Sequence, residues 1–359
     1  MTLSAMSYTV YAWTTMNLRG EFMQKISIIG AGLSCVDIIK SGRDTTYDFG
    51  GTAANVTCAL SRLGMNASLL VPHYGDRYAD SLIEEFRHQK INVVEFKRSR
   101  AATPCIIELC GLHGEHTFET VCPTCGTKLN HLILPTATDI RKLGSRLWED
   151  ANVFFFDRIS EGIKVGIRKA KEAGVWTYYE PNSCRQYSAF YNNVAQVDIV
   201  KFSGVRIPSA YADQLLLDLD EAAQTKLIIV SQGEKGLKFS LKADNGRFNE
   251  WIYLKAVTIQ NLIDTSGAGD WLTATFLWYF LREFAHTREM LSLNRIFKFL
   301  QDAQTVSAHS CQYTGPRGML KSSDGIAFLN HYFNCDMLLL AGNRMEESKY
   351  ICKSCLNPL

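Results

Sequence analysis

The sequence predicts an α/β protein with a central, mostly parallel β-sheet flanked by helices. Short apolar runs of strand length alternate with helical patterns, most clearly at residues 153–157, 161–173 and 175–179. Glycine-rich turns follow several of the predicted strands. The chain has 359 residues and is 47% hydrophobic, which is enough for a large core in one or two domains.

The composition argues against several classes of partner. A formal net charge of +2 gives no indication of nucleic-acid or membrane binding. No segment has the roughly 18 consecutive apolar residues of a membrane-spanning helix. Eleven cysteines are scattered along the chain, and Cys35, Cys58 and Cys105 lie in apolar segments. This pattern is typical of reduced thiols, so we expect a cytoplasmic protein.

The two ends differ from the central part. Residues 1–22 do not read as a secretory signal, because Arg19 is the first basic residue and polar residues interrupt the apolar run. We expect this extension to be disordered or not natively translated, with Met6, Met16 and Met23 as alternative starts. One folded domain is expected over residues 23–334, followed by a tail at 335–359.

The N-terminal half begins with a strand at 26–29 and a Gly-Ala-Gly turn. A dinucleotide-binding site is a poor interpretation, because Cys35 stands where a third glycine should be. Paired glycines, Gly50 and Gly51, then precede Asn55 and a helix that ends at Gly64. Glycines allow close approach of a ligand to the backbone, and the Asn amide both donates and accepts hydrogen bonds.

Further elements are predicted in order along the chain. Residues 103–110 and 115–119 predict a β-hairpin. The other predicted strands are 67–71, 198–201, 226–230, 237–241 and 251–257, and the other predicted helices are 78–89, 270–283 and 291–310.

Two CxxC pairs are widely separated in the chain. They comprise Cys122 with Cys125 and Cys352 with Cys355. Four thiolates are a common structural zinc site, so one interpretation is a single shared zinc. The alternative is two unrelated thiol turns.

The most informative stretch is Asp264 to Asp270, DTSGAGD, which precedes a long helix. Gly267, Ala268 and Gly269 predict a tight turn whose backbone N–H groups form an anion hole at the helix N-terminus. Asp270 lies in the first helical turn, where the helix dipole should keep the carboxylate ionised. It is either a catalytic base for a hydroxyl that attacks a phosphate, or only a helix cap.

Together, DTSGAGD and GGTAAN with LSRLG downstream resemble the ribokinase-like (phosphofructokinase B type) carbohydrate kinases over about residues 25–330. The resemblance implies transfer of the ATP γ-phosphoryl group to a sugar hydroxymethyl group, with Mg²⁺ bridging the phosphates. Fructose is the first substrate to consider, and a nucleoside is an alternative. It also implies a small β-sheet lid from residues near 33–50 and 92–122, and a homodimer through that lid.

The resemblance also implies roles for individual residues. Asp37 would bind sugar hydroxyls, although a plain turn residue is an equal interpretation, and Asp264 would bind a K⁺-type ion. The sugar would also be held by Gly50, Gly51 and Asn55, and the nucleotide by Ser231, Gly233 and Gly236 of the SQGEKG segment.

Two positions depart from the family pattern. Glu180 replaces the Asp of the D-P-N motif, and Ser203 to Arg206 replaces N-x-x-E, a pair that helps to organise magnesium and phosphates in relatives. Arg206 cannot replace a carboxylate near Mg²⁺, but it could hold a phosphate directly. These departures motivate a second hypothesis, a sugar- or nucleotide-binding protein with little catalysis.

Overall fold

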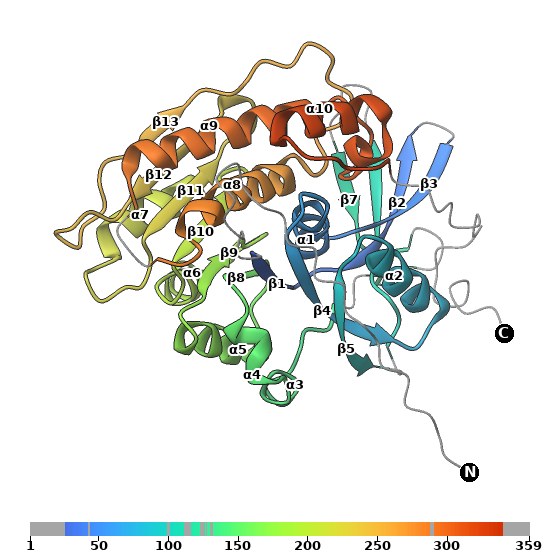
Figure 1. Ribbon diagram of the computed structural model, residues 1–359, viewed down its shortest axis with the longest axis horizontal. Coiled ribbons are helices and arrows are strands. Elements are labelled where there is room, and N and C mark those ends of the chain that lie inside the picture. Colours follow the sequence, from blue (N-terminus) through green and yellow to red (C-terminus); the bar gives the residue numbers. More distant parts are fainter. Residues whose placement is uncertain are drawn as a thin grey trace, which may run out of the picture.

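The computed structural model describes residues 26–41, 44–98, 101–110, 116–122, 126, 128–129, 132–287 and 291–339. These residues form a large α/β body with a small second sheet at one side (Figure 1). No helix in these ranges is both long and apolar enough to cross a bilayer.

The body is built on a nine-stranded sheet. Strands β1 to β11 of this sheet pair in parallel, and β12 and β13 add an antiparallel edge. The order across the sheet is β13 (Ile252–Leu254), β12 (Leu237–Leu241), β11 (Leu227–Ser231), β10 (Ile199–Ser203), β9 (Trp176–Tyr179), β8 (Val153–Phe156), β1 (Ser27–Ala31), β4 (Asn66–Tyr74) and β5 (Asn92–Arg98). The predicted fold class, a mostly parallel sheet flanked by helices, is confirmed.

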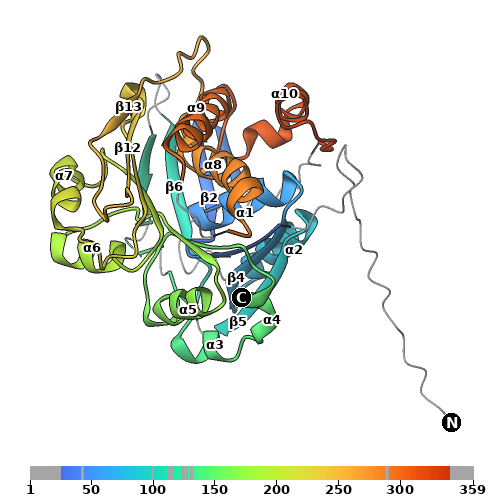
Figure 2. The same ribbon diagram turned by 60° about the vertical axis from the view of Figure 1, so that its left-hand side comes forward.

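Helices cover both faces of this sheet because its central strands are apolar on both sides. Val153 and Phe155 face one core cluster, whereas Phe154 and Phe156 face the other. The first face is covered by α1 (Thr52–Arg62), α2 (Arg77–His88), α8 (Ala268–Phe284), α9 (Leu293–Ser310) and α10 (Ser323–Phe333). The second face is covered by α3 (Ala137–Arg141), α4 (Ser145–Glu149), α5 (Glu161–Glu172), α6 (Tyr187–Val194) and α7 (Ser209–Asp218). Figure 2 shows α8 and α9 on one side of the sheet and α5 on the other.

The small sheet, which we call the lid sheet, has the order β3 (Asp44–Gly50), β2 (Cys35–Ser41), β6 (Cys105–Cys110) and β7 (His116–Glu119). The predicted hairpin is confirmed as β6 and β7, and β2 pairs with β6 in parallel. The predicted second lid segment, 92–122, starts too early. Its first strand, β5, pairs in parallel with β4 at the edge of the main sheet.

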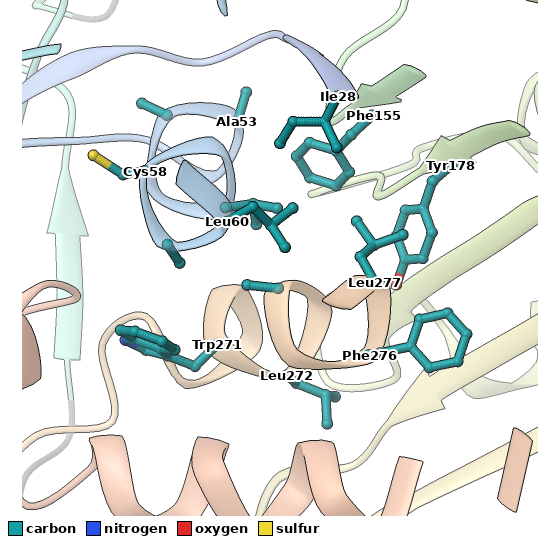
Figure 3. Close-up of a cluster of buried hydrophobic side chains, with 14 of the residues drawn as sticks. Ile28, Ala53, Cys58, Leu60, Phe155, Tyr178, Trp271, Leu272, Phe276 and Leu277 are labelled. Atoms are coloured by element: carbon teal, nitrogen blue, oxygen red, sulfur yellow. The ribbon is translucent and has the colours of Figure 1, made fainter. Parts of the chain in front are cut away.

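Helices α1 and α8 pack side by side against the middle of the main sheet. Figure 3 shows Leu60 of α1 and Leu277 of α8 near Phe155 and Tyr178 of the sheet. All four side chains are fully buried, and each large apolar side chain contributes roughly 1.5–3 kcal/mol through burial. This packing holds the N-terminal ends of the two helices next to each other.

Candidate functional site

The glycine turn before α8 has the geometry that the sequence predicts. Gly267 adopts a left-handed conformation with φ of 75°, and a Cβ atom there would overlap the backbone of Pro316. Only glycine fits both conditions. The N–H groups of Ala268, Gly269 and Asp270 lie in the first turn of α8, beyond the reach of intrahelical carbonyls. Within the described part of the chain, only the Ala268 N–H has a backbone partner, the Thr265 carbonyl, in a long bond of 3.3 Å. The turn therefore presents backbone donors at the positive end of the helix dipole.

Side chains from two other elements bind the carbonyl groups of this turn. Ser307 of α9 donates a hydrogen bond to the Ala268 carbonyl, with 2.7 Å between the oxygens. Lys201 of β10 donates from Nζ to the Gly269 carbonyl at 2.8 Å. The carbonyl groups are thus engaged on the protein side of the turn.

Asp270 meets Asn55 of α1 at the point where the two helices converge. Asn55 Nδ2 donates to Asp270 Oδ2 at 2.7 Å. Burial, and then the negative charge of Glu180, raise the pKa of Asp270 to about 7. The expectation that the helix dipole keeps this carboxylate firmly ionised is therefore wrong, because desolvation outweighs the dipole. A pKa near 7 suits a general base that works at neutral pH.

A buried polar network lies beneath Asp270. Lys201 Nζ lies 2.5 Å from Glu180 Oε1, and Thr273 donates to the other carboxylate oxygen of Glu180 at 2.6 Å. The Lys201 side chain is only 3% exposed. No motif in the sequence predicts this network. The available signal was a lysine within the otherwise apolar β10, since a buried charge needs a partner.

The lid sheet brings Asp37 and Gly50 to the same side of the site. Asp37 is buried on β2, and its Oδ1 accepts a hydrogen bond from the Cys35 thiol at 3.2 Å. Burial raises the pKa of Asp37 to about 8; the Cys35 hydrogen bond opposes this shift, and the charges of Glu108 and Asp48 add to it. A Cβ at Gly50 would overlap the Asp37 carboxyl group, so a larger residue there would displace that side chain.

Gly51 connects the lid sheet to α1. It has φ of 99° as the residue before the helix, and a Cβ there would overlap the Leu33 backbone. This close approach places Asn55 one turn into α1, facing Asp270.

A narrow crevice, too small to hold a water molecule, adjoins Asp270 on the side of residues 316–320. Trp271 closes one wall by donating from its indole nitrogen to the Pro316 carbonyl at 3.0 Å. The crevice is lined by Asn55, Ala59, Asp270, Trp271, Pro316, Arg317 and Leu320.

Arg317 joins this crevice to the lid sheet. Its guanidinium is 2% exposed, pairs with Asp48 of β3, and lies 3.5 Å from Glu85 of α2. Lys321 Nζ approaches the second oxygen of Asp48 at 2.5 Å. Burial acts to raise the pKa of Asp48, but Arg317 and Lys321 outweigh it and lower that pKa. Asp48 faces Asp37 in the register of β2 and β3, so these ion pairs hold the strand beside Asp37.

Asp264 connects two loops of the site. Its Oδ1 accepts from the Ser266 N–H at 2.5 Å, and its Oδ2 accepts from the Gly315 N–H at 2.6 Å. The side chain is 2% exposed. The role of Asp264 as a ligand of a monovalent cation stays a prediction.

The predicted nucleotide residues lie at the carboxyl end of β11. Gly233 and Gly236 have positive φ, of 60° and 94°. A Cβ at Gly236 would overlap the backbone at Leu254. The segment that follows Leu254 lines one side of a pocket of about 280 Å³, and the C-terminal half of α9 lines another. The pocket is lined by Val257, Thr258, Ile259, Gln260, Thr305, Ala308, His309, Gln312 and Phe328.

His309 lies in that pocket and is held by neighbours on α10 and just after α9. Its ring stacks on Phe328 with 3.6 Å between centroids, and Gln312 lies within hydrogen-bond distance of its Nδ1, at 3.0 Å. Burial lowers the pKa of His309, which favours a neutral ring. A pocket that combines apolar side chains, an aromatic ring and side-chain amides can hold a heterocyclic base.

Ser203 and Arg206 lie at the carboxyl end of β10. Ser203 is opposite Ser231 in the register of β10 and β11, and the Ser231 hydroxyl lies 3.5 Å from the Phe202 carbonyl. Arg206 donates to Asn182 Oδ1, after β9, and its guanidinium lies 5.8 Å from the Phe118 ring centroid in the lid sheet.

The predicted zinc ligands are placed only in part. Cys122 is buried at the base of the lid sheet. Cys125, Cys352 and Cys355 lie outside the described residues, as do the predicted extension 1–22 and all but 335–339 of the predicted tail. Within the described ranges no group of three His, Cys, Asp or Glu is arranged to hold a metal ion.

Known proteins share both the sequence pattern and the fold. A family model described as pfkB family carbohydrate kinase matches residues 20–124. A probable fructokinase-5 of Arabidopsis thaliana is 26% identical over 254 residues, which cover 64% of this chain and 72% of that protein.

Solved structures extend the likeness over most of the chain. The structure of ribokinase from Giardia lamblia has a TM-score of 0.65 at 14% identity and covers 82% of this chain and 95% of its own. The fructokinase from Vibrio cholerae O395, in a form with bound fructose, ADP and calcium ion, has a TM-score of 0.62 at 18% identity and covers 82% of this chain and 95% of its own.

Proposed function

Because this chain belongs to the ribokinase-like, or pfkB, family of carbohydrate kinases, we propose that its substrates are ATP and a sugar with a free hydroxymethyl group. The observation that carries this proposal is the pairing of Asp270, whose pKa is about 7, with a backbone anion hole one residue away. A binding protein would need neither feature.

In the proposed reaction Asp270 is the base. Its carboxylate accepts the proton from the sugar hydroxymethyl group as that oxygen forms a bond to the γ-phosphorus, and the bond from the γ-phosphorus to the leaving ADP oxygen breaks. The N–H groups of Gly267, Ala268 and Gly269 stabilise the charge on the transferring phosphoryl group. Asn55 keeps the carboxylate oriented through its 2.7 Å hydrogen bond.

The sugar would lie between the lid sheet and the crevice, in contact with Asp37, Gly50, Gly51 and Asn55. With a pKa of about 8, Asp37 is largely protonated at neutral pH. Its carboxyl group can therefore donate a hydrogen bond to one sugar hydroxyl and accept one from another. Closing this sheet over the sugar excludes water, which would otherwise compete for the phosphoryl group.

The nucleotide base would occupy the pocket beside α9, and its phosphates would extend past Ser231, Gly233 and Gly236. Ser307, which holds the anion turn, lies on α9 among pocket residues Thr305, Ala308 and His309. One helix thus connects the base pocket with the reacting centre.

The residues present offer few direct ligands for magnesium. Glu180 is already engaged by Lys201 and Thr273, and Arg206 is cationic. The Ser203 hydroxyl can hydrogen-bond a metal-bound water, so Mg²⁺ would arrive on the ATP phosphates and neutralise their charge there.

Fructose is the first sugar to test, because the fructokinases among the relatives support it. A nucleoside acceptor is the alternative. We further propose a cytoplasmic location, which the seven free thiols among the described cysteines support. A homodimer through the lid sheet is supported by Phe118 and Val121, which are exposed by 50% and 47%. Light scattering of the wild type and Val121→Asp would test the dimer.

The deciding experiment measures ADP release from ATP and Mg²⁺ across a panel of sugars and nucleosides. Activity on one compound that vanishes in Asp270→Asn, while calorimetry still detects sugar binding, is the expected result. Binding of a sugar without turnover by the wild type would instead favour a sugar-binding protein with little catalysis.

A further inference from the structure

Arg206 occupies the edge of the main sheet where three strands end. It follows β10, its partner Asn182 follows β9, and Ser203 faces Ser231 at the end of β11. In open α/β sheets, ligands bind at the carboxyl ends of the strands. The position of Arg206 is therefore one from which a side chain reaches a bound ligand.

Among the residues that the structure describes, the partners of the Arg206 guanidinium are neutral. It donates through one nitrogen to Asn182 Oδ1, and the Phe118 ring lies 5.8 Å away. In the part of the chain that the structure describes, no carboxylate lies within ion-pair distance of it. Buried Arg317, by contrast, is engaged by both Asp48 and Glu85.

Arg206 lies close to the reacting centre through its hydrogen-bond partner. Asn182 is two residues after Glu180, whose carboxylate accepts a hydrogen bond from Thr273 in α8. Arg206 and Lys201 are the two cations that act to lower the pKa of Asp270. Lys201 is buried and committed to Glu180 and the Gly269 carbonyl, whereas Arg206 is exposed. Arg206 is thus the cation of this pair that remains accessible to a ligand.

We propose that Arg206 binds a phosphoryl group next to Asp270. A guanidinium offers five N–H donors in a planar fork, and the Asn182 contact uses only one nitrogen. The other N–H groups of the guanidinium can bind two oxygens of one phosphate. The Phe118 ring restrains the guanidinium through a cation–π contact. The inference rests in part on the proposed kinase function.

Two sources of this phosphoryl group share the same chemistry. One is the nucleotide, favoured because Ser203 and Ser231 lie side by side at the strand ends. The other is a phosphate already carried by the sugar, since Phe118 belongs to the lid sheet.

The test compares Arg206→Met and Arg206→Lys with the wild type by calorimetry, using adenosine, ADP and fructose 6-phosphate as probes. Arg247→Met, which removes the same charge from the exposed turn between β12 and β13, is the matched control. For a nucleotide phosphate, ADP binding should weaken about ten- to hundredfold in Arg206→Met and less in Arg206→Lys, with adenosine binding unchanged. A selective loss of fructose 6-phosphate binding would assign the site to a phosphorylated sugar.

Unchanged binding of both phosphate-bearing probes in Arg206→Met would overturn the proposal. The same is true if Arg247→Met weakens ADP to the same extent, because the effect would then be one of overall charge. The outcome does not depend on turnover. A wild type that phosphorylates no sugar but needs Arg206 for ADP would contradict the proposed function and support this site.

Discussion

At the scale of single residues, the protonation state of Asp270 depends on neighbours that are distant in the sequence. Burial and Glu180 raise its pKa to about 7, while Asn55, Lys201 and Arg206 act in the opposite direction. The sequence motif identifies the aspartate but not these groups. The balance arises only when β9, β10 and α1 converge on the start of α8.

The first prediction concerns the pH dependence of the rate. A base must be ionised to accept a proton, so kcat should rise with pH and level off above about pH 7, where Asp270 is ionised. A steady-state profile of kcat from pH 5 to 9 measures this rise, which we call the pH limb. A limb near pH 4 would contradict a raised pKa.

The same shift predicts a stability effect of the opposite sign. The folded-state pKa lies above the unfolded value of about 3.9, so the native protein retains a proton longer than the unfolded chain. This group therefore lowers stability as pH rises from about 4 to 7. The melting temperature of Asp270→Asn relative to the wild type should increase across that range.

The second prediction separates the two charges beneath Asp270. Glu180→Gln removes a charge that raises the pKa of Asp270, so the limb should move to lower pH; Lys201→Met should move it to higher pH. Both variants should also lose about 3–5 kcal/mol of stability, because each leaves a buried partner unpaired.

Thr273→Val is the matched control for this pair. It removes a hydrogen bond to Glu180 without changing any charge. It should lower the melting temperature and leave the pH limb in place. Limbs that move in the same direction in Glu180→Gln and Lys201→Met would show that distortion, not charge, controls Asp270.

At the scale of elements, the ion pairs of Asp48 connect strand β3 of the lid sheet to residues 317–321, which follow α9. We predict that Lys321→Gln raises the KM for the sugar several-fold and increases ATP hydrolysis without sugar, because a looser lid admits water. Lys321 is the milder site, since its side chain is 37% exposed. Coupled assays with and without sugar measure both effects.

Lys298→Gln serves as the control for that variant. Lys298 pairs with Asp302 at 2.8 Å on the surface of α9 and is 60% exposed, so its loss should change neither quantity. Arg317→Gln should have the larger effect on the sugar KM, with a loss of stability from the uncompensated Asp48 and Glu85. An unchanged sugar KM in Lys321→Gln and Arg317→Gln would rule out a fastening role.

The sequence predicts the elements that carry strong patterns. The strand–turn–helix at α8 follows from DTSGAGD, and the predicted start of its helix at Asp270 is within two residues of Ala268. The short helices α3, α4, α6, α7 and α10 were not predicted. Helices of five to eleven residues give few repeats of the apolar spacing, and tertiary packing supplies much of their stability.

In the candidate site, the sequence predicts the residues that belong to motifs but not their distant partners. Motif residues Asn55 and Asp270 do meet, because they lie in the first turns of α1 and α8, which pack together. Lys201, Thr273, Arg317 and Lys321 were not predicted as part of it. Each acts through a partner 21 or more residues away in the sequence, and no local spacing reports such a pair.

At the scale of the whole molecule, the four-cysteine zinc site is a prediction about two distant segments. If Cys122 is one of four ligands, purified protein should contain one zinc per chain, and Cys122→Ser should lose it. Metal analysis by mass spectrometry measures both. Wild-type protein without zinc would favour two independent thiol turns.

The hydrogen bond between Asn55 and Asp270 joins residues 215 positions apart, and Arg317 is 269 positions from Asp48. On a ribosome that adds about 5–20 residues per second, Asn55 emerges roughly 10–40 s before its partner. The nascent chain must therefore keep the start of α1 and the lid sheet without their counterparts for that time. These N-terminal elements, with Asp37 and Asp48 exposed, are where a cellular chaperone would find its longest opportunity to bind.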